Sequence, residues 1–185
     1  MGRKTWLIVI AVFIVIIILV LLFTKFGKML INKTWDLISD ARIATLHPSI
    51  RAKAAQFLNE AEKKGYNLRV TSAYRSINEQ SDLYNKYLSG GPLAAKPGES
   101  YHNFGLAFDV VETEPYGFGE GYPQNRWTEI GKIGKKLGFT WGGDWLGEKH
   151  DRPHFQYSYG FTTAQLRDRI NLGKNLGQYP EISKA

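Results

Sequence analysis

An unbroken apolar run from Trp6 to Phe23 constrains this chain more than any other sequence feature. Its 18 residues, mostly Ile, Val and Leu, would extend roughly 27 Å as a helix, close to the hydrocarbon thickness of a bilayer. The run has no polar face, which argues against a surface helix of a soluble domain. We therefore expect a membrane segment over residues 6–23, preceded by a short terminus, residues 1–5.

A cleaved signal peptide and an uncleaved anchor both contain such a run. A signal peptide has a shorter apolar core, followed by small residues at its cleavage site. The residues that follow here, Thr24 to Lys28, provide no small pair at the right spacing. The sequence therefore favours an uncleaved transmembrane anchor, and we interpret residues 24–45 as a tether.

The net charge of +7 is concentrated near this anchor. Residues 1–33 contain five basic residues and no acidic one, whereas the rest of the chain has 19 basic and 17 acidic residues. Because the excess flanks the apolar run, we predict no nucleic-acid partner. Basic residues lie on both sides of the run, so they do not orient it. The chain has no cysteine, which excludes disulfides and thiolate zinc ligands.

Helical and strand patterns alternate beyond the tether. Ser76 and Glu79 form an S-x-x-E capping box, which explains Glu79 without a catalytic role. His47 stands at a helix entry and is interpreted as a structural residue. Periodicity predicts helices over residues 48–64, 77–89, 127–137 and 162–176, and strands over residues 66–76, 106–111, 139–141 and 153–159. The predicted domain covers residues 46–160, and residues 161–185 form a C-terminal extension.

Two histidines and an aspartate could meet at one metal. His102 precedes Asp109 by seven residues, and His154 lies in a later strand. Imidazole and carboxylate suit zinc, and three protein ligands leave a fourth position open, as in catalytic sites. Ordinary hydrogen-bonded side chains are the alternative. The H-x6-D spacing does not decide between them, because it is a weaker pattern than H-E-x-x-H.

Further charged residues could act beside such a metal. Asp151 could serve as a proton acceptor, but from the residues alone a turn-capping aspartate is the simpler interpretation, and His150 is a rival base. Arg75, at the end of a predicted strand, could stabilise a developing oxyanion, but a surface arginine is the simpler reading.

Five motifs occur together and in order: S-A-Y-R-S at 72–76, E-Q-x-x-L-Y at 79–84, G-E-S-Y-H-N-F-G-L-A-F-D at 98–109, W-G-G-D-W at 141–145 and D-R-P-H-F-Q at 151–156. This set resembles the zinc peptidases of peptidoglycan, which comprise D-alanyl-D-alanine carboxypeptidases and L-alanyl-D-glutamate endopeptidases. The chain is most similar to the endopeptidase branch. The resemblance covers about residues 45–157.

The resemblance implies roles for seven residues. It implies zinc held by His102, Asp109 and His154. Asp151 would be the general base and acid, and Arg75 would polarise the substrate carbonyl. Substrate contacts are expected at Gln80 and Ser100. The implied fold is α+β, of the hedgehog/D-Ala-D-Ala-peptidase type, with helices packed on one side of a small antiparallel sheet and a zinc cleft. The N-terminal transmembrane helix expected ahead of it and the C-terminal extension are departures from the family pattern.

The implied function is zinc-dependent hydrolysis of the L-alanyl-D-glutamate bond in the peptidoglycan stem peptide. A D-alanyl-D-alanine carboxypeptidase or dipeptidase is the nearest alternative, and the loop 112–126 would distinguish the two. A non-catalytic zinc-fold module that binds cell wall is the alternative of another class. Because peptidoglycan lies outside the cytoplasm, we expect a single-pass protein of the bacterial cytoplasmic membrane. Residues 1–5 would then be cytoplasmic, and the domain would lie on the periplasmic or extracellular side.

Overall fold

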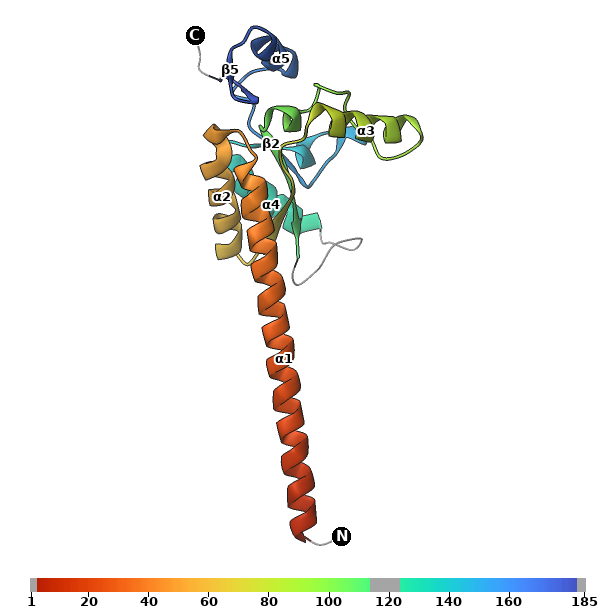
Figure 1. The fold of residues 1–185 in the computed structure, drawn as a ribbon, viewed down its shortest axis with the longest axis vertical. Helices are drawn as coiled ribbons and strands as arrows, with labels where there is room; N and C mark the ends of the chain where they lie inside the picture. The colour runs from red at the N-terminus through yellow and green to blue at the C-terminus, as the bar shows by residue number, and fades with distance from the viewer. Residues whose placement is uncertain (1–2, 114–123, 183–185) are drawn as a thin grey trace. The chain divides into compact units, whose positions relative to one another are not determined.

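The computed structural model describes residues 3–113 and 124–182 (Figure 1). Within helices it leaves aside the side chains of residues 3–12, 21, 22, 25, 26, 28, 30–32, 35 and 124. The chain divides into two compact units, Met1–Ile38 and Ser39–Ala185. Helix α1, Arg3–Ala44, begins in the first unit and contributes its last six residues to the second.

The prediction of a transmembrane helix over residues 6–23 gains no support from the described helices. Across the residues that the structure describes, no helix has a stretch long and apolar enough to cross a membrane. The side chains of residues 6–12, 21 and 22 lie outside that description. Residues 24–44, predicted as a tether, are helical.

A four-stranded antiparallel sheet organises the second unit, as predicted. Its strand order is β1-β2-β4-β3, and each neighbouring pair is antiparallel. The strands are β1 (Leu68–Ser72), β2 (Ala107–Glu112), β3 (Thr140–Trp141) and β4 (His154–Gln156). The short 3₁₀ segments are η1 (Tyr101–Phe104), η2 (Gly142–Asp144) and η3 (Gly147–Lys149).

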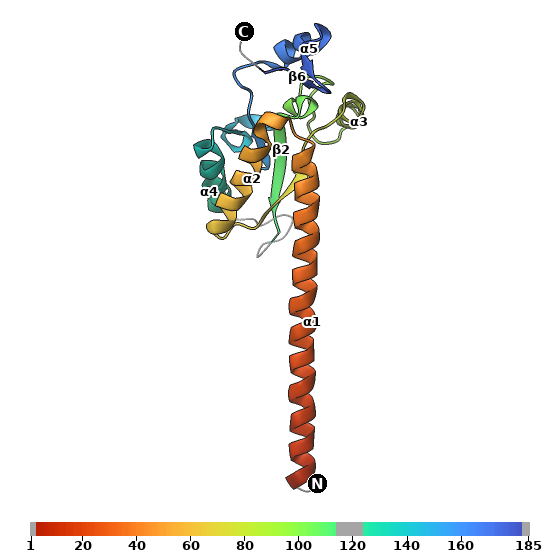
Figure 2. The same cartoon turned by 60° about the vertical axis from the view of Figure 1, so that its left-hand side comes forward.

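Helices α2 (Pro48–Lys63) and α4 (Gln124–Lys136) cover one face of the sheet. The ring of Phe57 on α2 lies 4.6 Å from the ring of Phe155 on β4. Gly134 on α4 packs so closely on that Phe155 ring that an added Cβ would lie 2.3 Å from it. Both helices therefore share the apolar face, whereas α3 (Ile77–Leu88) lies on the other side of β2 (Figure 2). The opposite face carries polar side chains, including that of Asp109.

The free edge of β1 is covered by the end of α1. The Val70 N–H donates to Ser39 Oγ at 3.1 Å, and Arg42 Nη1 donates to the Val70 carbonyl at 2.5 Å. An exposed strand edge invites pairing with other chains, so these two side chains complete the sheet. The compact unit accordingly starts at Ser39, ahead of the predicted domain start at residue 46.

The C-terminal extension packs on the start of α2. It contains α5 (Thr163–Asn171) and a hairpin of β5 (Asn175–Leu176) and β6 (Tyr179–Pro180). The Tyr179 hydroxyl donates to the Thr45 carbonyl at 2.7 Å, and His47 Nε2 lies 3.0 Å from the Pro180 carbonyl. The other ring nitrogen of His47 accepts from the Ser49 N–H, which caps α2, so the structural role predicted for His47 is confirmed.

The loop expected to set specificity lies mostly outside the described residues, which omit 114–123. Its base is described. The buried Glu112 carboxylate forms an ion pair with Arg126, which joins the end of β2 to the first turns of α4.

Candidate metal centre and active site

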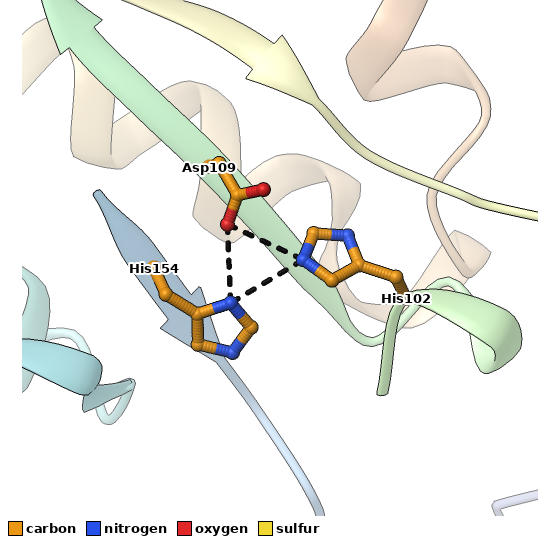
Figure 3. Close-up of side chains that lie close together, drawn as sticks. All are labelled: His102, Asp109 and His154. Carbon is orange, nitrogen blue, oxygen red and sulfur yellow. Dashed lines mark hydrogen bonds and ion pairs between the residues drawn. The ribbon is translucent and has the colours of Figure 1, made fainter. Parts of the chain in front are cut away.

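Three elements bring His102, Asp109 and His154 together on the polar side of the sheet. Asp109 on β2 lies directly opposite His154 in the antiparallel pairing with β4. His102 comes from η1, and the chain then turns at Gly105 (φ 66°) into β2. The three side chains point toward one another (Figure 3). The cross-strand register is thus what places two of the predicted ligands side by side.

The spacing of the donor atoms fits a small tetrahedral cation. His102 Nε2 lies 3.3 Å from both His154 Nδ1 and Asp109 Oδ1, and His154 Nδ1 lies 3.1 Å from that same oxygen. Bond lengths of about 2.0–2.1 Å to zinc give a tetrahedral edge of about 3.3 Å. These three atoms therefore form one face of a tetrahedron of the required size.

Hydrogen bonds on the far sides of the rings fix which nitrogens face this point. His102 Nδ1 lies 2.6 Å from the Ala73 carbonyl, which can only accept, so Nδ1 carries the proton. His154 Nε2 donates in the same way to Gln156 Oε1 at 3.0 Å. When both rings are neutral, two lone pairs and a carboxylate oxygen consequently converge with no proton between them. These converging lone pairs repel one another unless a cation lies between them. The hydrogen bonds from the outer ring nitrogens are the usual support of metal-bound histidines.

The electrostatics around the carboxylate point the same way. Burial would raise the pKa of Asp109, but the charges and hydrogen bonds of His102 and His154 outweigh it and lower that pKa strongly. Burial would likewise lower the pKa of His154, but Asp109, helped by Gln156, raises it. In the metal-free protein a proton would therefore occupy the place that a metal would take.

Arg75 reaches this centre from the loop after β1. Its Nη2 lies 3.8 Å from Asp109 Oδ2 and donates to Ser72 Oγ at 3.0 Å. Its Nη1 donates to Gln80 Oε1 at 2.9 Å, and the Gln80 amide donates in turn to the Ala95 carbonyl at 2.7 Å. The guanidinium is thus held in place beside the metal site.

Gln80 and Ser100 were predicted to contact substrate, and the structure describes other contacts for them. Gln80 is 1% exposed, and its contacts orient Arg75. Ser100 caps η1, with its hydroxyl 3.4 Å from the His102 N–H. Their substrate contacts stay predictions.

Asn103 is a site residue that the sequence reasoning missed. Its side chain donates to the Arg75 carbonyl at 2.9 Å and accepts from the Gly98 N–H at 3.0 Å. The backbone N–H of Arg75 also donates to the His102 carbonyl at 3.0 Å. Asn103 therefore links the arginine loop to the histidine turn. Its position directly after His102 was the available signal.

A tight turn supported by Gly142 presents Asp151. The Asp151 N–H donates to the Gly142 carbonyl at 3.0 Å, and its own carbonyl accepts from the His154 N–H at 3.3 Å. A Cβ on Gly142 would lie 2.3 Å from the Asp151 oxygen and 3.1 Å from the His154 Cβ. This crowding explains a glycine in the W-G-G-D-W motif.

The surroundings of Asp151 suit a proton acceptor. Asp151 is partly exposed to solvent. Partial desolvation of its carboxylate, together with the negative charge of Asp109, nevertheless raises the pKa of Asp151. The charges of His154 and His102 oppose this rise in pKa without cancelling it. The rival base His150 is exposed and turns one ring nitrogen to the Trp145 carbonyl at 3.2 Å. The Trp145 ring, also unforeseen, lies 5.1 Å from the His154 ring.

The imidazole–carboxylate donor set at this sheet is of the kind that metal-dependent hydrolases use. The VanY family model, described as D-alanyl-D-alanine carboxypeptidase, matches residues 43–168. The chain therefore belongs to the VanY family, and the predicted family and peptidase class are confirmed.

Two curated relatives carry a more specific name. The chain is 36% identical over 122 residues to the peptidoglycan L-alanyl-D-glutamate endopeptidase CwlK of Bacillus subtilis (strain 168), covering 60% of this chain and 72% of that protein. It is 31% identical over 123 residues to the L-alanyl-D-glutamate peptidase of Listeria phage A118, covering 64% of this chain but 40% of the phage protein. The chain thus spans less than half of the phage enzyme.

A solved structure shows the same fold. The LdcB LD-carboxypeptidase, whose description concerns peptidoglycan recognition, matches with a TM-score of 0.50 at 22% identity. The match covers 60% of this chain and 58% of that one.

Proposed function

We propose that this protein is a zinc-dependent endopeptidase that hydrolyses the L-alanyl-D-glutamate bond of the peptidoglycan stem peptide. The observation that carries the proposal is the convergence of three metal donors, His102, Asp109 and His154, in a chain similar to two enzymes named for that bond. The donor set is borderline in softness and contains no thiolate, which suits zinc among the common metals.

Zinc bound by these residues would supply a Lewis acid that acidifies water and polarises the scissile carbonyl. The protein supplies the rest of the chemistry. Ala73 and Gln156 hold the two imidazoles in the tautomers that the metal needs. Asp151, with its raised pKa, accepts the proton of the attacking water and passes it to the leaving amine. Arg75, fixed by Ser72 and Gln80, stabilises the oxyanion as charge develops on the carbonyl oxygen.

The family description favours a second candidate, a D-alanyl-D-alanine carboxypeptidase. A relative named as the putative carboxypeptidase YodJ of Bacillus subtilis (strain 168) is 29% identical over 135 residues. A carboxypeptidase needs a free terminal carboxylate at the scissile residue, whereas an endopeptidase does not. A module that only binds wall would need neither Asp151 nor Arg75, and both are present.

Digestion of defined muropeptides by the purified full chain tests the proposal, with products identified by mass spectrometry. We expect release of L-alanine-terminated and D-glutamate-started fragments, and loss of this activity on chelation with recovery on adding zinc. Release of single D-alanine instead would establish the carboxypeptidase. Wall binding without any cleavage would establish the binding module.

We also propose that residues 6–23 anchor the protein in the bacterial cytoplasmic membrane, with the peptidase domain on the outer side. Their uniform apolarity supports this, and the described side chains from Phe13 to Val20 are 50–65% exposed. An anchored protein should stay in the membrane pellet after carbonate extraction, and external protease should digest its domain in spheroplasts. Recovery in the soluble fraction, or a domain protected in intact spheroplasts, would reject the proposal.

A further inference from the structure

A hollow of about 480 Å³ opens beside Arg75. It lies between β1, α3 and the final turn of α1, and its lining includes Arg42, Ser72, Asp82 and Lys86. Its volume falls within the roughly 300–1,000 Å³ of typical ligand pockets. It is therefore large enough to receive part of a peptide substrate.

Arg75 connects this hollow to the metal centre. Arg75 lines the hollow, and its guanidinium Nη2 lies 3.8 Å from Asp109 Oδ2. Ser72, which accepts a hydrogen bond from that guanidinium, lines the hollow as well. A peptide whose scissile carbonyl meets Arg75 would therefore have its neighbouring residues at the mouth of the hollow.

The charges of the lining favour an anion. Three cationic residues and two acidic residues line the hollow. Of the acids, Glu79 is already engaged, because its carboxylate accepts from the Ser76 N–H at 2.8 Å and from the Ser76 hydroxyl at 2.7 Å. Asp82 is exposed on α3, one turn before Lys86.

Arg42 can serve two purposes at once. A guanidinium has five N–H donors, and the bond to the Val70 carbonyl uses one of them. Arg42 also precedes residue 43, where the family match begins, so this part of the lining is not a feature of the matched segment.

We propose that this hollow binds a carboxylate of the wall peptide, and that Arg42 and Lys86 are its specificity-determining cations. The inference rests on the proposed function, because it names a group on the substrate of the same site. In such a peptide the α-carboxylate of D-glutamate is free, because the chain continues through its γ-carboxyl, and a peptide that ends at the third residue carries a second carboxylate there. Arginine and lysine recognise either one by the same chemistry.

Four synthetic tripeptides of the sequence L-alanyl-γ-D-glutamyl-L-lysine separate these sources. One is the free acid, one is amidated at the glutamate α-carboxylate, one at the lysine carboxylate, and one at both. The parent protein should cleave the free acid with a kcat/KM about two- to tenfold higher than that for one of the two singly amidated peptides. The position of the amide in that poorer substrate identifies the carboxylate that the hollow binds. The difference should appear mainly in KM and should shrink as salt is added.

Three variants of the full chain test the assigned side chains. Lys86→Gln should reduce the discrimination by about two- to fivefold, as expected for one solvent-exposed ion pair. Asp82→Asn, on the same helix, removes a charge of opposite sign and should increase it. Lys132→Gln on α4 is the matched control and should leave it unchanged. Arg42→Gln should also reduce discrimination, and its unfolding curve separates that effect from loss of the Val70 bond.

The possible outcomes distinguish the two proposals. Equal cleavage of all four peptides would overturn the carboxylate subsite and leave the endopeptidase standing. Discrimination that persists unchanged in Lys86→Gln and Arg42→Gln would also overturn it. If the zinc-loaded protein cleaves D-alanyl-D-alanine but none of the four peptides, the proposed endopeptidase activity itself is rejected.

Discussion

Replacing Asp151 by asparagine tests the proton acceptor while preserving the turn that carries it. The hydrogen bonds described for Asp151 are made by its backbone, to Gly142 and from His154, and asparagine can keep both. We therefore expect a change in the free energy of unfolding of less than about 1 kcal/mol. Losing a positioned general base costs about a hundred- to ten-thousand-fold in rate, which is about 3 to 5 kcal/mol in the activation barrier.

The assay pairs kcat on a wall peptide with zinc content from elemental analysis of the same sample. Asp151→Asn should retain about one zinc per chain, because Asp151 is not among the three donors. Asp144→Asn is the matched control, since Asp144 is exposed and pairs with Lys135 at 2.8 Å, and it should cleave at the parent rate. A rate for Asp151→Asn within a few-fold of the parent would refute the assignment and make His150 the next candidate.

Three further predictions concern the metal site and its support. His154→Ala should lose zinc as well as activity, and full zinc content by elemental analysis would contradict its role as a ligand. The pKa of His154 is raised above its usual 6.5, so below that raised pKa zinc must displace a proton. Zinc affinity, measured by chelator competition, should therefore rise by up to about tenfold per pH unit from about pH 6 until that pKa is passed, and a pH-independent affinity would contradict the raised pKa. Tyr179→Phe removes the hydrogen bond to Thr45 and should lower the free energy of unfolding by about 1 kcal/mol in denaturant titrations, and an unchanged midpoint would show that this bond contributes nothing.

The parts of the fold and site that the sequence revealed are those with local chemical signatures. The Ser76–Glu79 capping box formed as predicted, because both partners lie within one turn. The spacing of His102 and Asp109 indicated a turn that leads into a strand, and the structure has both, whereas the proposed ligand role came from the resemblance and not from the spacing.

Contacts between distant segments could not be predicted in the same way. The sequence does not show that Ser39 and Arg42 complete the edge of β1, since that depends on where α1 ends in space. Gln80 was expected to face substrate, and its burial against Arg75 follows from the packing of α3. Tertiary placement decided these roles, and helical or strand periodicity carries no information about them.

The packing of the C-terminal hairpin on the start of α2 has a consequence for the order of folding. The bond from Tyr179 to Thr45 joins residues separated by 134 positions, and His47 bonds both Pro180 and the Gly105 carbonyl beside the His102 turn. Contacts of such long range close late, because the entropy of the intervening chain must be lost first. The hairpin is synthesised after residues 39–160, and it therefore helps only at a late stage to complete the turn that presents His102. A chain still being synthesised would lack this support, so its hydrolytic centre would form after the rest of the domain.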